Sequence, residues 1–248
     1  MTKYLIFQLY GPLQSWGDVA VGEIRPTSGR PTRSALLGLI SACLGIRRHE
    51  EERLQKLADS IGIMVRVDAP GMRLTDYHTV QSSREKKKRV FFCRKDELGP
   101  FLGSDEDLTT ILSRREYLMD ALFIVCLWSK KEEDELSLEM LEESLTRPRL
   151  LPYLGRKSCP PALPFNPMLA EADGPIEALD RYPVDAVVRE IATAPRAVHF
   201  FSEPYEGMKG QIKVMSTRDQ PLHHGRRQFT TRQEVMISLS EKLLDQGG

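Results

Sequence analysis

Two stretches of the chain are apolar at nearly every position, and they constrain the fold more than any other feature. Tyr4–Leu9 is apolar apart from Gln8, and Leu118–Trp128 is apolar apart from Asp120. Strands in the middle of a sheet covered on both faces have this pattern, because neither face meets water. Both stretches are too short for a membrane-spanning helix, which takes about 20 apolar residues. They predict buried strands in a layered domain of helices and strands.

A helix is predicted to begin after Thr32 or Ser34, either of which can act as its N-cap, and Gly45 is placed to end it. Its apolar positions recur at helical spacing: Leu36, Leu37, Ile40, Cys43 and Leu44. Two further helices are expected, one from about Glu50 to Asp59 and one around Leu138–Leu145.

Between these helices, Ile61–Val67 alternates apolar residues with Gly62, Met64 and Arg66, which predicts a half-buried strand. Leu74–Val80 is a further strand candidate, and a highly charged segment follows it. The order is strand, helix, strand, insertion, strand, helix, which is most of a β-α-β-β-α-β ferredoxin-like pattern. The fourth strand of that pattern is not evident from the sequence.

The segment after the last predicted helix has a different composition. Pro148–Pro167 contains six prolines and is typical of an ordered loop or linker. Four short strands are predicted beyond it: Ala186–Ile191, Ala197–Phe201, Gln211–Thr217 and Gln233–Leu239. We therefore expect one domain over residues 1–160 and a small β-rich C-terminal extension over residues 161–248.

The overall charge does not indicate a nucleic-acid-binding protein, because 35 Lys and Arg balance 35 Asp and Glu among 248 residues. The four cysteines form no C-x-x-C pair, and no Cys and His cluster has zinc-ligand spacing. We therefore expect a reduced cytoplasmic protein with no metal and no cofactor. Any site for a polyanion must come from local clusters of charge.

The most basic stretch surrounds two phenylalanines, Phe91 and Phe92. Its cations are Arg84, Lys86, Lys87, Lys88, Arg89, Arg94 and Lys95. Cations contact phosphates, and aromatic rings stack on the bases of single strands. The alternative is a solvated hairpin whose basic residues pair with the acids that follow, such as Asp96 and Glu97. A third hypothesis is contact with duplex DNA through Lys86–Arg89.

Two other stretches have features of phosphate-binding loops. Arg25, Arg30 and Arg33 lie at the predicted start of a helix together with Thr32 and Ser34, and helix N-termini attract anions. The alternative is ordinary helix capping. Gly155 is followed by Arg156 and Lys157, and a glycine turn flanked by cations lets backbone N–H groups approach a phosphate. A basic surface loop is the alternative there.

Tyr77 and His78 suggest the one catalytic hypothesis. A metal-independent ribonuclease needs a general acid, a general base and a cation, and His, Tyr and Lys can serve. A single His beside a Tyr on a strand is more often a hydrogen-bonded or RNA-contacting residue. His223-His224 lacks further ligands and is read as a surface loop.

Six collinear blocks of the sequence, spanning residue 4 to about 235, resemble the CasD subunits of type I-E Cascade. CasD subunits belong to the repeat-associated mysterious protein (RAMP) superfamily. The blocks are YLIFQLYGPLQSWG, RPTSGRPTRSALLGLISACLGI, LTDYHTV, SRREYLMDALFIVCLW, LTRPRLLPYLGRKSCPP and GRRQFTTRQEV.

The resemblance implies an α+β fold with a ferredoxin-like (RRM-like) domain and an inserted β-hairpin thumb, here at about residues 80–112. It implies a non-catalytic subunit that holds the 5′ handle of the CRISPR RNA and contacts the CasC backbone subunit and the large CasA subunit. Target DNA near the adjacent motif is a further candidate partner. The alternative function is a metal-independent endoribonuclease that processes the precursor RNA.

The RNA-binding residues expected from the local patterns and the matching blocks together come from the whole length of the chain. They are Trp16, Arg25, Arg30, Thr32, Arg33, Ser34, Tyr77, His78, Arg84, Lys86, Lys87, Lys88, Arg89, Arg114, Arg115, Tyr153, Gly155, Arg156, Lys157, Arg226 and Arg227.

Overall fold

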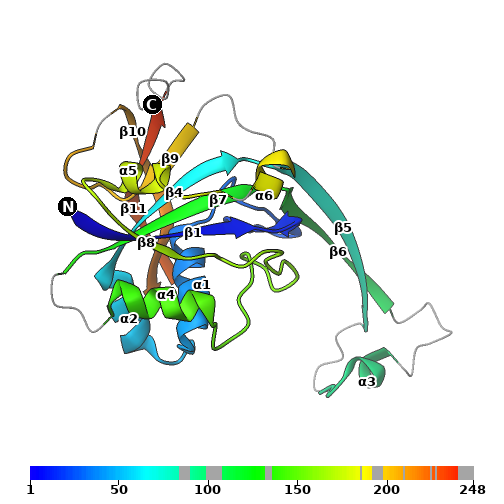
Figure 1. Cartoon of the computed structure of the whole chain (residues 1–248). Helices are drawn as coiled ribbons and strands as arrows, with labels where there is room; N and C mark the ends of the chain where they lie inside the picture. The colour runs from blue at the N-terminus through cyan, green and yellow to red at the C-terminus, as the bar shows by residue number, and fades with distance from the viewer. Residues whose placement is uncertain are drawn as a thin grey trace.

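A seven-stranded antiparallel sheet covered by helices forms the body of the protein, and a long hairpin projects from it (Figure 1). The computed structural model describes residues 1–83, 90–98, 108–131, 136–184, 186–191, 198–208, 210–223, 225–226 and 228–239. Among the helices of these residues, none combines the length and apolarity needed to cross a bilayer.

The strands of the large sheet lie in the order β10-β11-β9-β4-β7-β1-β8. Their bounds are β1 Thr2–Tyr10, β4 Ile61–Ala69, β7 Leu122–Ser129, β8 Met168–Ala172, β9 Val198–Ser202, β10 Gln211–His223 and β11 Gln228–Leu239. Each neighbouring pair is antiparallel, with Phe7 opposite Val125 in the central pair.

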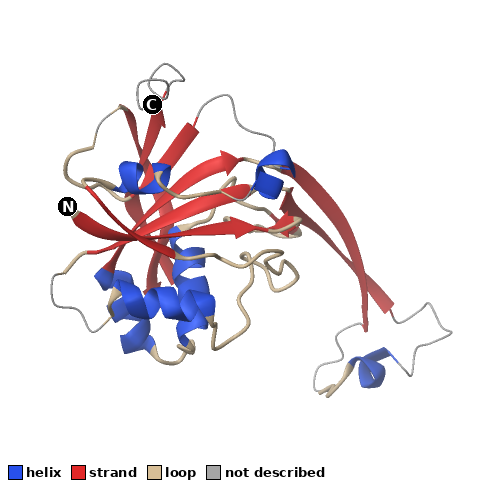
Figure 2. Cartoon of the chain, in the orientation of Figure 1, coloured by secondary structure: helices blue, strands red, loops and turns tan. Residues whose placement is uncertain are grey.

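Helices cover both faces of this sheet (Figure 2). On one face lie α1 (Arg33–Leu44), α2 (Glu51–Ser60) and α4 (Leu138–Thr146), and on the other lie α5 (Pro175–Asp180) and α6 (Ala186–Ile191). Alternate residues of β1 enter the two cores: Leu5 and Phe7 pack on the first face, and Tyr4 and Ile6 on the second. The prediction of a covered sheet is confirmed, because β1 is buried on both sides from Tyr4 onward.

The projecting hairpin consists of β5 (Met72–Ser83) and β6 (Leu108–Met119), with α3 (Arg94–Leu98) near its far end (Figure 1). The hydroxyl of Ser82 donates a hydrogen bond of 2.8 Å to Glu97, which ties α3 to β5. At the near end β6 also pairs with the two-residue strands β2 (Leu13–Gln14) and β3 (Ile24–Arg25). Of the segment predicted as an insertion, residues 80–83 and 108–112 belong to β5 and β6.

The predicted helices over the first half of the chain are confirmed. The side chain of Thr32 caps α1 by accepting from the Ala35 N–H, and Gly45 ends the helix in the left-handed conformation at φ 76°. The strands predicted at Gln211–Thr217 and Gln233–Leu239 are confirmed within the longer β10 and β11.

Three predictions of local structure were wrong. Leu118–Trp128 is two strands, because Asp120 adopts φ 53° and turns the chain between β6 and β7. Ile61–Val67 is buried on both faces: Met64 is enclosed, and Arg66 donates to Asp68 and to the Leu179 carbonyl. Residues 186–191 form the helix α6, whose Val188 is buried while Val187 is exposed.

Candidate nucleic-acid interface

A groove of about 1400 Å³ opens beside α1, and we call it the α1 groove. It lies between α1 with the loops at both its ends, the loop of residues 150–157, and the hairpin of β10 and β11. Its polar and aromatic lining consists of Trp16, Asp18, Ser28, Arg30, Thr32, Ser34, Ser41, Arg47, Arg48, Tyr153, Arg156, Lys157, Ser216, Thr217, Arg218, Asp219, His223, Gln228 and Phe229. Its remaining lining is small or aliphatic and includes Gly38 and Gly155.

The α1 groove brings together two stretches that the sequence analysis singled out separately. Arg30, Thr32 and Ser34 lie at the start of α1, and Tyr153 and Gly155–Lys157 lie in the loop on the other side. These two stretches are more than a hundred positions apart in the chain, so only the fold makes them neighbours. From the segment that forms the third wall, β10 and β11, the sequence predicted only Arg226 and Arg227 as RNA contacts, and Arg226 does not line the groove.

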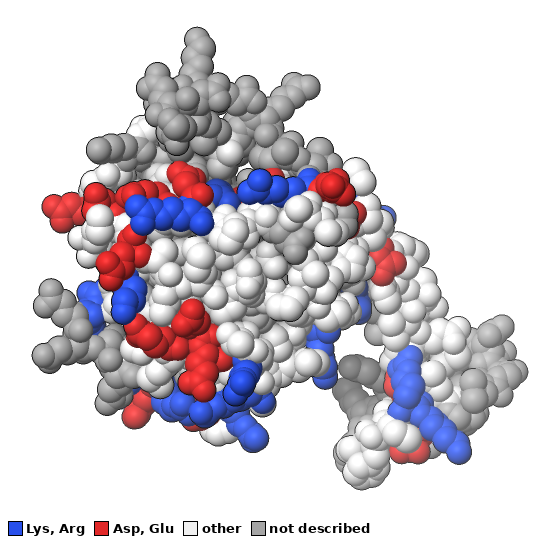
Figure 3. Space-filling model, viewed as in Figure 1, with Lys and Arg blue, Asp and Glu red and all other residues white. Residues whose placement is uncertain are grey.

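Cations outnumber acids in this lining although the whole chain is neutral. Its cations are Arg30, Arg47, Arg48, Arg156, Lys157 and Arg218, and its acids are Asp18 and Asp219. Such an excess favours a phosphate backbone. On the face drawn in Figure 3, Lys and Arg lie among Asp and Glu along the lower edge of the body, and further Lys and Arg lie around α3.

Four residues of the groove were not predicted from the sequence: Arg47, Arg48, Arg218 and Phe229. The first two follow the Gly45 cap after Ile46, and a pair of cations just past a helix stop was the available signal. Arg218 lies in the middle of β10, where the sequence gives no sign that the strand borders a groove.

Two aromatic rings of the α1 groove are partly open to solvent. Tyr153 is 39 % exposed and Phe229 is 37 % exposed. Rings in this setting can stack on splayed bases, a contact that single-stranded RNA uses widely. The groove therefore offers both kinds of contact, cations for phosphates and rings for bases.

The 153–159 loop is held tightly against the start of the chain. The N–H of Ser15 donates to the Leu154 carbonyl at 3.1 Å, and the N–H of Leu154 donates to the Cys159 carbonyl at 2.7 Å. The guanidinium of Arg156 lies over the ring of Tyr117, 4.7 Å from its centroid. Its Nη1 is buried and has no hydrogen-bond partner among the described residues, which leaves a donor beside the groove.

Two of the expected RNA contacts are corrected because their side chains lie in the interior. Trp16 is 1 % exposed, its indole N–H donates to Gln14 at 3.0 Å, and its ring packs edge-on against Phe123. Arg33 is 4 % exposed. Neither the ring of Trp16 nor the guanidinium of Arg33 is open to a base or a phosphate.

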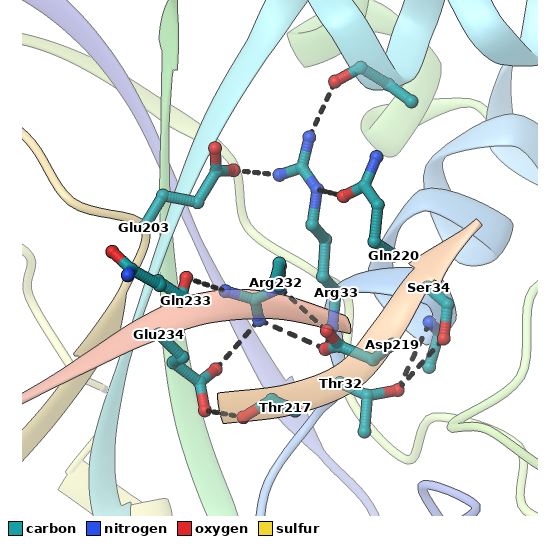
Figure 4. A network of polar contacts seen from close by, with 12 residues as sticks. Thr32, Arg33, Ser34, Glu203, Thr217, Asp219, Gln220, Arg232, Gln233 and Glu234 are labelled. Carbon is teal, nitrogen blue, oxygen red and sulfur yellow. Dashed lines mark hydrogen bonds and ion pairs between the residues drawn. The ribbon is translucent and has the colours of Figure 1, made fainter. Parts of the chain in front are cut away.

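Arg33 belongs to a buried ionic network that joins α1 to the C-terminal strands (Figure 4). Its guanidinium pairs with Glu203 and donates to Gln220 at 3.1 Å and to the Ala58 carbonyl at 2.6 Å. Burial lowers the pKa of Arg33 to about 10, which leaves the side chain charged at neutral pH. The network is therefore a structural link beneath the α1 groove.

Arg30 and Arg232 complete this network. Arg30 pairs with Glu234 and lies 3.9 Å above the centroid of Phe201. Arg232 donates to Asp219 at 2.6 Å and to Glu234 at 2.8 Å.

The N-terminus of α1 was expected to attract a phosphate, yet protein oxygens already occupy it. The backbone N–H of Arg33 donates to the Asp219 carboxylate at 2.7 Å, and the N–H of Ala35 donates to the Thr32 hydroxyl. The capping alternative therefore describes this helix end, and the phosphate-binding hypothesis moves to the cations of the groove.

Five other expected residues lie on the projecting hairpin and on β3, which pairs with it: Arg25, Tyr77, His78, Arg114 and Arg115. β3 runs parallel to β6 with Arg25 beside Arg115, and β5 places Tyr77 opposite Arg114. The side chain of His78 contacts Asp76, with Nε2 2.7 Å from Oδ2. This cluster is separate from the α1 groove, because none of its residues lines that groove.

Six expected residues lie outside the described part of the chain: Arg84, Lys86, Lys87, Lys88, Arg89 and Arg227. Of their neighbours, Arg94 and Lys95 lie in α3 near the exposed ring of Phe92. Arg226 is exposed in the turn between β10 and β11.

Comparisons with known proteins agree with one another. Residues 4–237 match the family model described as CRISPR-associated protein (Cas_Cas5). The chain is 37 % identical to the CRISPR system Cascade subunit CasD of Escherichia coli (strain K12) over 96 % of each protein.

Two solved structures are also similar to the chain. A chain of a CRISPR RNA-guided surveillance complex has a TM-score of 0.64 and 27 % identity, covering 95 % of this chain and 89 % of its own length. A protein described as Crystal structure of Cas protein has a TM-score of 0.61 and 28 % identity, covering 96 % of both chains.

Proposed function

The chain belongs to the CRISPR-associated protein (Cas_Cas5) family, as a Cascade CasD-type subunit of a surveillance complex, and from this premise we propose that it holds the guide RNA without cutting it. The α1 groove is the proposed seat of the RNA. The observation that carries the proposal is the convergence of six cations and two half-exposed rings on one groove of a neutral chain.

Each part of the groove has a role in this proposal. Phosphates lie against Arg47, Arg48, Lys157 and Arg218, all of which are exposed. Phosphate contacts position a strand without reading its sequence, and base contacts select it. Tyr153 and Phe229 are the proposed stacking residues, and they give the 5′ handle a preferred register.

The ferredoxin-like description of the fold is part of the proposal. It is supported by the order β8-β1-β7-β4, with one helical segment between β1 and β4 and another between β7 and β8. β8 then takes the place of the fourth strand that the sequence did not reveal. The hairpin of β5 and β6 is the proposed thumb, and the division at about residue 160 stays a proposal.

We also propose the partners that the family resemblance implies, a backbone subunit of the CasC type and a large subunit of the CasA type. The cluster at the hairpin root, with Arg25, Tyr77 and Arg114, is a second candidate contact for the RNA or a neighbouring subunit. A location in the cytoplasm and a contact with target DNA remain predictions.

The endoribonuclease hypothesis depends on His78, whose imidazole is oriented by Asp76. An Asp can orient a His for proton transfer, so the Asp76–His78 pair is the one observation that favours the endoribonuclease hypothesis. Replacing His78 by Ala and Tyr77 by Phe should leave RNA ends unchanged if the subunit only holds the guide. Loss of cleavage of the repeat would support the nuclease instead.

The test of the proposal uses the RNA that co-purifies when the chain is expressed with its neighbouring subunits and a repeat–spacer transcript. A synthetic copy of its 5′ end is titrated with the wild-type chain and with the triple variant Arg47→Gln, Arg48→Gln, Lys157→Gln. We expect the triple variant to bind at least about tenfold more weakly, with a shallower dependence on salt, because phosphate contacts release counterions.

A second triple variant, Lys3→Gln, Arg181→Gln, Arg189→Gln, removes the same charge from exposed positions outside the groove. It should bind like the wild type once salt is high enough to screen long-range attraction. Equal losses in the two triple variants would contradict the groove as the binding site.

A further inference from the structure

The acidic side chain at the N-terminus of α1 carries an inference that rests on the proposed RNA-binding function and deepens it. We propose that Asp219 is a specificity-determining residue of the α1 groove. Its carboxylate occupies the position that an RNA phosphate would otherwise take, and it directs the backbone to the exposed cations elsewhere in the groove.

The contacts of Asp219 are those of a bound anion. The side chain is 4 % exposed and accepts three hydrogen bonds, from the Arg33 N–H at 2.7 Å and from Arg232 at 2.6 Å and 3.0 Å. Helix N-termini bind anions through such N–H groups and the helix dipole, and α1 is 12 residues long. A carboxylate and a phosphate satisfy these donors in the same way.

The arginines next to Asp219 explain why a carboxylate is needed at the N-terminus of α1. Arg33 and Arg232 lie in one network here (Figure 4), Arg30 pairs with Glu234 of the same network, and Arg binds phosphate through paired hydrogen bonds. If no carboxylates neutralised these arginines beside an open groove, the arginines would bind any polyanion regardless of its sequence. Three carboxylates, those of Asp219, Glu203 and Glu234, pair with them.

Among these three acids, Asp219 is the one that lines the α1 groove. Glu203 and Glu234 instead border a separate small space. Because the Asp219 carboxylate is buried and paired with Arg232, an RNA in the groove finds this anion position already filled, and its phosphates lie against the exposed cations instead. Closing one anion position favours one register over the others, because specificity is a difference between two binding free energies.

The test compares wild type, Asp219→Asn and the matched control Asp18→Asn, which removes the other carboxylate of the groove. Two RNAs are titrated, the synthetic 5′ end described above and a scrambled RNA of equal composition. We expect Asp219→Asn to bind the scrambled RNA about tenfold more tightly, with a steeper salt dependence, and to lose most of its preference between the two. Asp18→Asn should keep the preference.

If Asp219 has a purely structural role, Asp219→Asn should bind both RNAs more weakly by the same factor, and that result would overturn the inference. An unchanged preference in Asp219→Asn, or the same loss of preference in Asp18→Asn, would overturn it too.

A second measurement covers the case in which the substitution disturbs folding. Asp219→Ala vacates the carboxylate, so inorganic phosphate should raise the Tm of this variant above its value in chloride at equal ionic strength. The Tm values of wild type and Asp18→Ala should not respond. Absence of a phosphate-specific rise would overturn the inference. If wild type does not prefer the 5′-end RNA, the proposed function fails, while the phosphate measurement still decides the role of Asp219.

Discussion

Gly155 lies so close to the backbone of Ser15 that a Cβ at residue 155 would overlap the Ser15 carbonyl oxygen and lie 2.7 Å from its carbon. Gly155 also adopts φ +80°, a conformation that residues with a side chain rarely take. This close approach docks the loop that carries Tyr153, Arg156 and Lys157 on the first strands. The wall of the α1 groove thus depends on a position without a side chain.

Replacing Gly155 by Ala should displace this loop. Positive φ alone costs a residue with a Cβ about 1–2 kcal/mol, and the overlap with Ser15 adds to it. We expect a lower free energy of unfolding in urea and at least about tenfold weaker binding of the 5′-end RNA. Gly22→Ala is the control, because Gly22 has φ +59° but no atom within 4 Å of its Cβ. Equal effects of the two substitutions would contradict the docking role.

Substitutions at Gly38 test whether RNA occupies the α1 groove. Gly38 lies inside α1 and lines the groove, and a Cβ there would meet open space. Gly38→Ala should raise the free energy of unfolding by about 0.5–1 kcal/mol, because Ala is the better helix former. Gly38→Leu should keep the fold and weaken RNA binding about tenfold or more by filling the groove. Gln55→Leu, at an exposed helical position outside the groove, should leave binding unchanged.

Much of the fold could be predicted from local patterns, and much of the site could not. The caps of α1 and the apolar run of β1 are local signals, and both were confirmed. α6 was missed because its β-branched residues favour a strand, while the burial of Val188 in the second core positions the helix.

The groove itself has no local signal, since its walls come from three distant parts of the chain. Arg33 illustrates the limit. It is as basic as Arg25, yet the fold pairs its guanidinium with Glu203, just after β9, and with Gln220 of β10, and removes it from the surface.

Arg33→Met should destabilise the protein by about 3–5 kcal/mol, because it leaves Glu203 short of a partner in a buried site. Denaturation in urea measures this loss. Arg53→Met removes an exposed pair with Glu50 and should change the free energy of unfolding by less than about 1 kcal/mol. A loss below about 1 kcal/mol for Arg33→Met would show that the buried network contributes little.

Lys130 should make the stability depend on pH. Its pKa is lowered to about 8, chiefly because the ammonium group is removed from water and also because Arg33 lies near. The unfolded chain then binds more protons than the folded one between about pH 8 and 10.5, so this group makes stability rise with pH in that window. Urea denaturation gives the free energy of unfolding of wild type and of Lys130→Met. As the pH rises from 7 to about 9.5, the value for wild type should rise relative to that of the variant. Lys131→Met controls for the lost surface charge, and a difference that stays constant with pH would contradict the assignment.

The central claim is that the α1 groove holds the 5′ end of the guide RNA, and photo-crosslinking in the assembled complex tests it most directly. The guide carries a photoreactive base at successive positions of its 5′ end, and the crosslinked peptides are identified by mass spectrometry. The account predicts crosslinks in residues 28–35, 46–48, 153–157 and 216–229. Crosslinks confined to the hairpin of β5 and β6, with none in these segments, would contradict it.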